Sequence, residues 1–192
     1  MSSSATSSLS SCPYHFALSN SLTSISTFNP DTHNLSMFNP SPNPSPITSL
    51  TYNHNNNVLA ASTTSGMVNL FHSSTGALLE SLDNKSPTTS ISFGGKSRYL
   101  SASDTKGFVS VWDLKRKSKV RSFPPPASLF LNSPTTHHHS TTTSATCCGF
   151  DPSDQIIVAG YDVGATCASF NIKSGVSLST FTPNSNSNSN SN

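Results

Sequence analysis

Aromatic, aliphatic and glycine positions recur along the chain at fixed intervals. In each copy an aliphatic residue follows the aromatic one after seven residues, and a glycine follows after fourteen. The three copies are Tyr52–Leu59–Gly66, Phe93–Leu100–Gly107 and Phe150–Ile157–Gly164. The first two copies are 41 residues apart. A fixed period of this length indicates a repeated structural unit rather than one continuous sheet or bundle.

Each repeat also contains the pattern of four short strands. In the second copy the runs TTSISF, RYLSAS, FVSVWD and KVRSF are rich in β-branched and aromatic residues, and turn-forming residues separate them. The third run ends in Trp112 and Asp113, where the other copies have Phe71 and Phe170. An antiparallel meander of this size cannot bury both of its faces alone, so it is stable only when stacked against similar units.

Four short strands in a period of 41 residues, with a terminal Trp-Asp pair, are typical of a WD-repeat β-propeller blade. The predicted fold is therefore all-β, a partial propeller of three to four blades spanning residues 14–181. A fourth copy, at the start of this region, is incomplete because its first strands are short or missing. The predicted organisation is a disordered segment at 1–13, a partial blade at 14–38, full blades at 47–82, 87–123 and 145–181, an inserted loop at 124–144 and a disordered Ser/Asn tail at 182–192. The predicted structural anchors are Tyr52, Leu59, Gly66, Phe71, Phe93, Leu100, Gly107, Trp112, Asp113, Phe150, Ile157, Asp162, Gly164 and Phe170.

Three or four predicted blades do not determine how the propeller ring closes. A seven-bladed ring of such units needs about 290 residues, and this chain has 192. Either the chain is a fragment of a longer propeller, or it closes by pairing with another chain, or its end blades expose strand edges that favour aggregation. We expect a fragment, because the last full copy runs directly into the Ser/Asn tail.

The sequence shows no catalytic or metal-binding pattern. The acidic side chains are one Glu and seven scattered Asp, and no nucleophile motif or phosphate loop is present. The three His at 137–139 have no second ligand cluster. Cys147, Cys148 and Cys167 fall in predicted strands without metal-ligand spacing, so we expect them to be core or wall residues in a reducing compartment. The prediction is a non-enzymatic protein without cofactor, metal ion or small-molecule substrate.

Positive charge is concentrated in the second full repeat. Between Lys96 and Arg121 lie eight of the ten basic residues of the chain and two Asp, a local net charge of +6. The first-to-second and third-to-fourth turns of a meander share one rim, which suits an acidic or phosphorylated protein, with nucleic acid less favoured. The simpler interpretation is a solvated turn that keeps the blade soluble. The expected rim comprises Lys96, Arg98, Lys115, Arg116 and Lys117.

The hydrogen-bond network usual in WD repeats is incomplete. Only Asp162 stands two residues before a turn glycine, whereas Thr64 and Thr105 hold that position in the other copies. No Gly-His dipeptide is present, so Trp112 lacks its usual set of polar partners. We expect blades held mainly by the apolar faces of their strands.

Two stretches carry a more specific resemblance. The segment from SRYLSAS to VWDLKRK, residues 97–117, and the segment NHNNNVLA, residues 53–60, are similar to the N-terminal propeller of the centrosomal and spindle WD-repeat proteins that target the γ-tubulin ring complex. The resemblance covers most of residues 14–181, but only the first half of that propeller.

The resemblance implies a recruiting adaptor with protein partners. In that family the propeller is associated with centrosomes and spindles, and a helical C-terminal region docks γ-tubulin complexes. The implied location is the cytoplasm and cytoskeleton, with the nucleus as a second possibility. The alternative is a WD-repeat scaffold or substrate receptor in ubiquitin ligation or in chromatin or RNA assembly. No helical periodicity follows Phe181, so γ-tubulin docking is the least supported part.

Overall fold

The computed structural model describes residues 9–12, 15–20, 23–29, 33–38, 45–131 and 143–182. In this part of the chain sixteen strands form four antiparallel sheets of four strands each, and one short helix is present. In every sheet the strands lie in chain order, so each sheet is a simple meander. No helix in the described ranges is long and apolar enough to span a membrane. The predicted all-β fold class is confirmed.

The strand bounds follow the repeats. The first sheet contains β1 (Leu9–Cys12), β2 (His15–Asn20), β3 (Ser24–Asn29) and β4 (Asn34–Phe38). The second contains β5 (Ile47–Tyr52), β6 (Val58–Thr63), β7 (Met67–His72) and β8 (Leu78–Asp83). The third contains β9 (Thr88–Phe93), β10 (Tyr99–Asp104), β11 (Val109–Asp113) and β12 (Ser118–Phe123). The fourth contains β13 (Ala145–Phe150), β14 (Ile156–Tyr161), β15 (Cys167–Asn171) and β16 (Ser177–Phe181).

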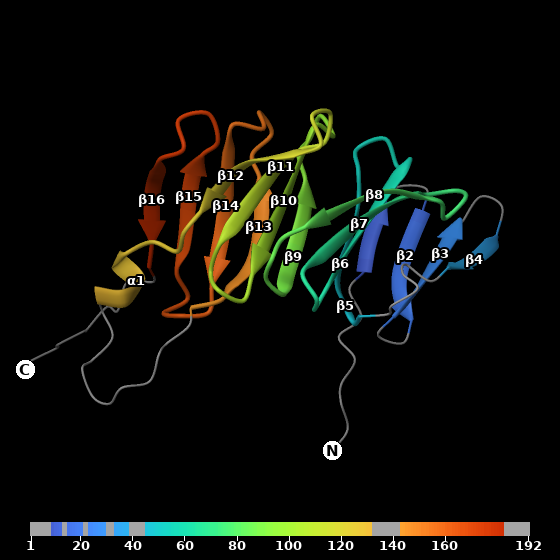
Figure 1. Cartoon of the computed structure of the whole chain (residues 1–192), viewed down its shortest axis with the longest axis horizontal. Coiled ribbons are helices and arrows are strands. Elements are labelled where there is room, and N and C mark those ends of the chain that lie inside the picture. The colour runs from blue at the N-terminus through green and yellow to red at the C-terminus, as the bar shows by residue number, and fades with distance from the viewer. Residues whose placement is uncertain are drawn as a thin grey trace, which may run out of the picture.

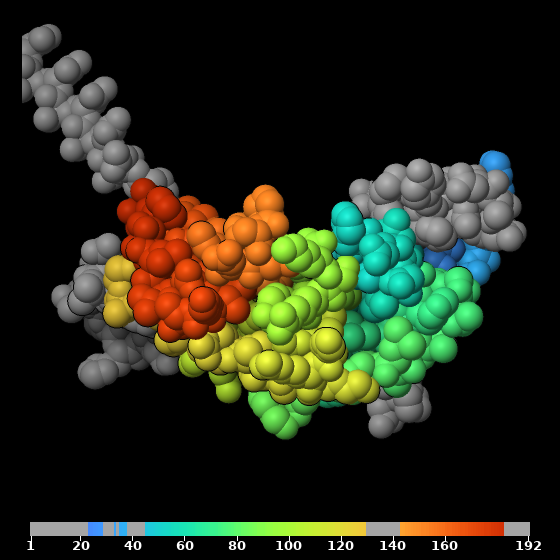
Figure 2. Space-filling model, turned by 90° about the horizontal axis from the view of Figure 1, so that it is seen from above, coloured from blue at the N-terminus to red at the C-terminus, as the bar shows by residue number. Residues whose placement is uncertain are grey.

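The four sheets stand side by side in chain order, as successive blades of a partial propeller (Figure 1). Their first strands form the line of contact, because β5 contacts both β1 and β9, and β9 also contacts β13. Seen from above, the second, third and fourth sheets follow one another along one continuous body (Figure 2). Each meander therefore buries a face against its neighbour, which it cannot do alone.

The register within the sheets explains the sequence period. In the second sheet Leu59 pairs with Tyr52 on one side and with Phe71 on the other. In the next two sheets the corresponding rows are Phe93–Leu100–Trp112 and Phe150–Ile157–Phe170. The three central aliphatic residues are completely buried. The period thus places one aromatic–aliphatic–aromatic row across three strands of each sheet.

The sequence-based boundary of the first blade is wrong. The first sheet has all four strands and begins at Leu9, so it is not a partial blade, and residues 9–12 are not disordered. The segment LSSC has no apolar alternation, but it pairs with β2 from Leu9↔Leu18 to Cys12↔His15. Backbone hydrogen bonds to a neighbouring strand can order a segment whose side chains give no strand signal. The predictions for residues 1–8 and 183–192 lie outside the described residues.

The predicted loop at 124–144 contains a helical turn. Helix α1 spans Ser128–Leu131, directly after the run Pro124–Pro126, and Leu129 is buried among the side chains of the third and fourth sheets. The apolar residue gains contact with the core, and the prolines favour the start of a helix. The prediction of an unstructured insertion is therefore wrong for this turn, and residues 132–142 lie outside the described part of the chain.

The hydrophobic core is divided among the junctions between sheets. Ile25 of the first sheet packs with Leu59 and Phe71 of the second. Leu82 of the second sheet lies in one cluster with Leu100 of the third. At the last junction Phe123 stacks on Phe170, with ring centroids 4.8 Å apart and an interplanar angle of 23°. Each junction is thus a small core between two meanders.

Candidate protein-binding surface

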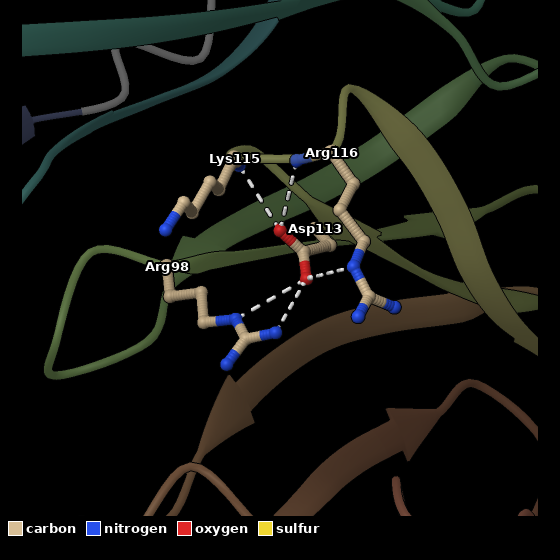
Figure 3. A network of polar contacts seen from close by, with 4 residues as sticks. All are labelled: Arg98, Asp113, Lys115 and Arg116. Atoms are coloured by element: carbon tan, nitrogen blue, oxygen red, sulfur yellow. Dashed lines mark hydrogen bonds and ion pairs between the residues drawn. The ribbon is translucent and has the colours of Figure 1, made fainter.

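Two turns of the third sheet meet at the carboxylate of Asp113 (Figure 3). One oxygen, Oδ1, accepts hydrogen bonds from the backbone N–H groups of Lys115 at 3.0 Å and Arg116 at 3.1 Å. The other, Oδ2, accepts from Nη2 of Arg98 at 2.9 Å and from its Nε at 3.2 Å. Asp113 therefore orders its own turn through the backbone N–H groups. Its second oxygen links that turn to the turn that carries Arg98.

The environment of Asp113 favours its charged form. The residue is only 1% exposed, and this burial by itself would raise its pKa. The hydrogen bonds from the Arg98 guanidinium and from the N–H groups of Arg116 and Lys115, with the positive charge of Arg98, outweigh burial and lower the pKa. The carboxylate therefore remains charged at neutral pH and holds both turns.

We call the five exposed cations on these turns the basic rim. Arg98 forms an ion pair with Asp113, and Nε of Arg116 lies 4.0 Å from the same carboxylate. Nζ of Lys117 forms an ion pair with Glu80 of the second sheet at 2.5 Å. Among the described residues, Lys96 and Lys115 have no carboxylate partner. The rim members are Lys96, Arg98, Lys115, Arg116 and Lys117.

Three residues of the rim line two grooves, each lying at a junction of sheets: Lys96 and Arg98 line one and Lys117 the other. The basic groove, between the third and fourth sheets, has a volume of about 450 Å³. The apolar groove, between the second and third sheets, has a volume of about 330 Å³. The basic groove is lined by Lys96, Arg98, Tyr99, Arg121, Asp154 and Lys173, among others. The apolar groove is lined by Val58, Leu70, Leu79, Phe93, Glu80 and Lys117, among others.

Two clamps fix the walls of the basic groove. Asp154, in the turn between β13 and β14, accepts hydrogen bonds from the N–H groups of Gly95 at 2.7 Å and Lys96 at 3.1 Å. Arg121 of β12 donates from Nε to the carbonyl of Ile172 at 3.0 Å and from Nη2 to that of Lys173 at 2.9 Å. Each clamp joins the third sheet to the fourth, so the two walls are held at a fixed separation.

Sequence reasoning missed three residues of this groove. Arg121 lies in the basic run, but nothing in the sequence places its side chain across a junction. Lys173 is the only basic residue in the predicted blade at 145–181, and in the sequence Asp154 is an ordinary turn residue. In the structure Asp154 is buried and has a positive φ of 59°, and the sequence indicates neither property.

The anchor glycines lie in turns that need a left-handed backbone. Gly66 and Gly107 have φ values of +88° and +81°. A Cβ at Gly66 would lie 2.6 Å from the carbonyl oxygen of Ser86, and one at Gly107 would lie 2.7 Å from that of Thr143. Both glycines therefore allow a connecting segment to pass close to the turn. Gly164 also has a positive φ, of +64°, but has more room.

The polar anchors do not form the usual WD-repeat network. Asp162 accepts a hydrogen bond from the backbone N–H of Ser144 at 2.9 Å and makes no hydrogen bond to Trp112. The turn between β10 and β11 is ordered instead by Asp104, which accepts from the N–H groups of Lys106 and Phe108 at 2.9 Å each. Trp112 is partly buried at the junction of the second and third sheets, and its Nε1 has no hydrogen-bond partner.

The cysteines are more exposed than expected. Cys147 and Cys167 are exposed, whereas Cys148 is partly buried and lies 3.3 Å from the hydroxyl of Ser101 in the third sheet. The expectation that all three are core or wall residues is wrong for the two exposed ones, because the face of the fourth sheet turned away from the third is uncovered. Val158 and Phe181 are likewise 43% and 60% exposed. No cluster in the described ranges could hold a metal ion, and residues 137–139 lie outside those ranges.

A comparison with protein families finds one WD40 repeat domain. Residues 16–96 match the family described as the anaphase-promoting complex subunit 4 WD40 domain. This segment spans most of the first sheet, the second sheet and the beginning of the third. The search of curated proteins gave no match.

The four stacked meanders are the arrangement of a partial β-propeller, and residues 16–96 are similar to a WD40 repeat domain. The match supports the WD-repeat propeller family and does not extend to the centrosomal subfamily suggested by the sequence. WD40 domains bind other proteins, and proteins built from them are generally non-catalytic scaffolds.

Proposed function

We propose that this protein is a non-enzymatic WD-repeat adaptor that binds an acidic protein partner through its basic rim. The observation that carries the proposal is the convergence of Arg98, Lys115 and Arg116 on the single carboxylate of Asp113. One negative charge orders two turns that carry five cations, so an excess of positive charge faces solvent. Such a surface accelerates the encounter with an acidic partner and selects against basic ones.

The particular role that we propose is the recruitment of γ-tubulin complexes for microtubule nucleation. Its support is the sequence resemblance of residues 97–117, the segment that contains all members of the rim except Lys96. We accordingly propose that the protein acts in the cytoplasm at the centrosome or spindle, with the nucleus as the second location. The rim would then face an acidic surface of tubulin type or a phosphorylated spindle-pole component.

The test compares two double variants that remove the same charge. Lys115→Gln/Arg116→Gln changes the rim, and Lys85→Gln/Lys106→Gln changes turns at the other end of the sheets. Partners captured from mitotic extract, γ-tubulin among them, are quantified by mass spectrometry. We expect the rim variant to lose most of the captured partner and the control variant to retain it, because turn side chains carry little packing.

Circular dichroism of both variants serves as the check on folding. Capture should also fall as the ionic strength rises beyond about 0.15 M, where the screening length is about 8 Å. Equal capture by the folded rim variant and the unmodified chain would refute the role of the rim.

A second candidate function is supported by the family match. The matched domain is named for a subunit of the anaphase-promoting complex, so a structural place in a multi-subunit assembly is the alternative that we propose. In that case the captured proteins would be subunits of one stable assembly, without γ-tubulin. Their recovery would also depend little on salt, because stable assemblies bury large apolar interfaces.

A further inference from the structure

The basic groove and the apolar groove occupy the same place in two successive junctions, yet they differ in charge. In the apolar groove the only two charged lining residues, Glu80 and Lys117, neutralise each other as an ion pair. The basic groove is lined by four cations and one carboxylate. Because the architecture of the two junctions is the same, the fold does not require the excess charge of the second.

The single carboxylate of the basic groove is already satisfied. Both oxygens of Asp154 accept backbone N–H groups, from Gly95 and Lys96. Asp154 is also buried, with an exposed fraction of 7%. It therefore orders the wall of the groove and is poorly placed to pair with the lysine side chains, both of which are exposed.

The four cations retain donors for a ligand. Arg98 uses Nε and Nη2 on Asp113, which leaves Nη1 outside that ion pair. Lys96 and Lys173, on opposite walls, have no ion-pair partner among the residues that the structure describes. Arg121 is fixed in place by the carbonyls of the fourth sheet. The guanidinium groups of Arg98 and Arg121 are held by these contacts, so they lose little freedom when an anion binds.

The rest of the lining suggests a peptide rather than a nucleic acid. The ring of Tyr99, with the guanidinium of Arg98 5.0 Å from its centroid, and the side chains of Val120 and Ile172 supply apolar walls beside the cations. A volume of about 450 Å³ suits one anionic side chain and a neighbouring apolar one. A long basic track and a row of stacking aromatics, which single-stranded nucleic acid needs, are not part of this lining.

We propose that the basic groove binds an anionic side chain, phosphoserine, phosphothreonine, Glu or Asp, of a peptide segment from a protein partner. Lys96 and Lys173 contact the anion from opposite walls, Arg98 donates from Nη1, and Tyr99 packs against the neighbouring apolar residue. This inference rests on the proposed adaptor function and names the group that the adaptor recognises. Charge-assisted hydrogen bonds to several cations favour a dianionic phosphoryl group over a carboxylate.

The experiment measures the binding of labelled peptide pools to the full chain by fluorescence anisotropy. Each pool has about ten residues with a fixed centre, phosphoserine, Glu or Ser, flanked by mixed apolar residues. We expect the phosphoserine pool to bind more tightly than the Glu pool, with the Ser pool weakest. Binding of the phosphoserine pool should weaken from about 0.05 M to about 0.5 M salt.

The variant Lys96→Gln/Lys173→Gln tests the groove, and Lys85→Gln/Lys106→Gln, which lies outside the rim, is the matched control of equal charge. Neither groove substitution removes a clamp, because the clamps use the backbone atoms of Lys96 and Lys173. We expect at least a tenfold loss of affinity, as an order of magnitude, in the groove variant, and less than about a twofold change in the control.

Three results would overturn the proposal. The first is an equal loss in both variants, which would mean non-specific attraction to the positive charge of the chain. The second is an absence of binding by either anionic pool up to about 1 mM. The third is tighter, groove-dependent binding of a single-stranded oligonucleotide. Failure of the adaptor function is distinguishable, because it appears in the capture experiment as equal capture of partner by the Lys115→Gln/Arg116→Gln variant and the unmodified chain.

Discussion

Asp154 of the fourth sheet accepts a hydrogen bond of 2.7 Å from the backbone N–H of Gly95 in the third sheet. A second hydrogen bond, from the N–H of Lys96 at 3.1 Å, completes this clamp. A Cβ at Gly94 would lie 2.6 Å from Oδ1 of Asp154, so any other residue at that position would have to displace the carboxylate. Two sheets are thus joined by a polar contact outside their shared apolar core.

We predict that Asp154→Ala destabilises the protein by about 1–3 kcal/mol, because two N–H donors lose their partner in a partly buried site. The free energy of unfolding is measured by urea denaturation. Asp162→Ala serves as the control, since Asp162 is exposed and accepts a hydrogen bond from the backbone N–H of Ser144. A loss in the Asp162 variant as large as that in the Asp154 variant would contradict the clamp.

We predict that Gly66→Ala and Gly107→Ala each destabilise the chain by about 1–3 kcal/mol or more, because a Cβ there meets a positive φ and a nearby carbonyl oxygen. Gly149→Ala is the matched control, since nothing lies within 4 Å of its Cβ position. The control should be neutral or slightly stabilising, as strand glycines are entropically costly. Thermal denaturation followed by circular dichroism ranks the variants, and indistinguishable behaviour of all three would show that the turn geometry is wrong.

We predict a pH-dependent contribution of Asp113 to stability. Its pKa is lowered in the folded chain, so its contribution is complete above the unfolded pKa of about 3.9 and is lost as the pH falls below it. Asp113→Asn should therefore be less stable than the unmodified protein at pH 7. The difference in unfolding free energy should shrink as the pH is lowered from 5 to about 3. A difference that stays constant across this range would show that the carboxylate charge is not the source of the stabilisation.

We predict that Trp112→Ala costs about 3 kcal/mol, because the indole packs at the junction of the second and third sheets. The ammonium group of Lys119 also lies 4.9 Å from the centroid of the Trp112 ring, which adds a cation–π contact. Trp112→Phe keeps an aromatic ring and should recover most of the loss. As the chain has a single Trp, its fluorescence reports this junction directly. An emission maximum typical of indole in water would contradict the packing.

Much of the fold was predictable because it depends on local order. The spacing of Tyr52, Leu59 and Phe71 specifies three strands in register, and each later copy repeats that information. The first sheet was only half predicted, because β1 is ordered by pairing with β2 and not by its own side chains. The helical turn at Leu129 was missed for a similar reason, since its burial depends on two sheets distant in sequence.

The rim was predictable from the sequence because alternate turns of one meander lie at the same edge of the sheet. In the sequence the carboxylate at its centre, Asp113, stands out only as part of the Trp-Asp signature, and its hydrogen bonds to Arg98 and to the backbone of Lys115 are specified by the turn geometry. Lys117 was grouped with the rim, yet its ion pair with Glu80 assigns it to the apolar groove. The sequence could not show this division, because it depends on how successive sheets are placed side by side.

The amino-acid sequence by itself determined the repeat, the four strands of each full copy and the position of the charge, because these follow from the types and spacing of residues along the chain. Only the tertiary structure decided what lies between sheets. The Asp154 and Arg121 clamps, the exposure of Cys147 and Cys167 and the contrast between the two grooves each depend on how separate repeats are placed against one another. The physical reason is that a meander encodes its own hydrogen-bond pairing locally, whereas the environment of its outer faces is supplied by its neighbours.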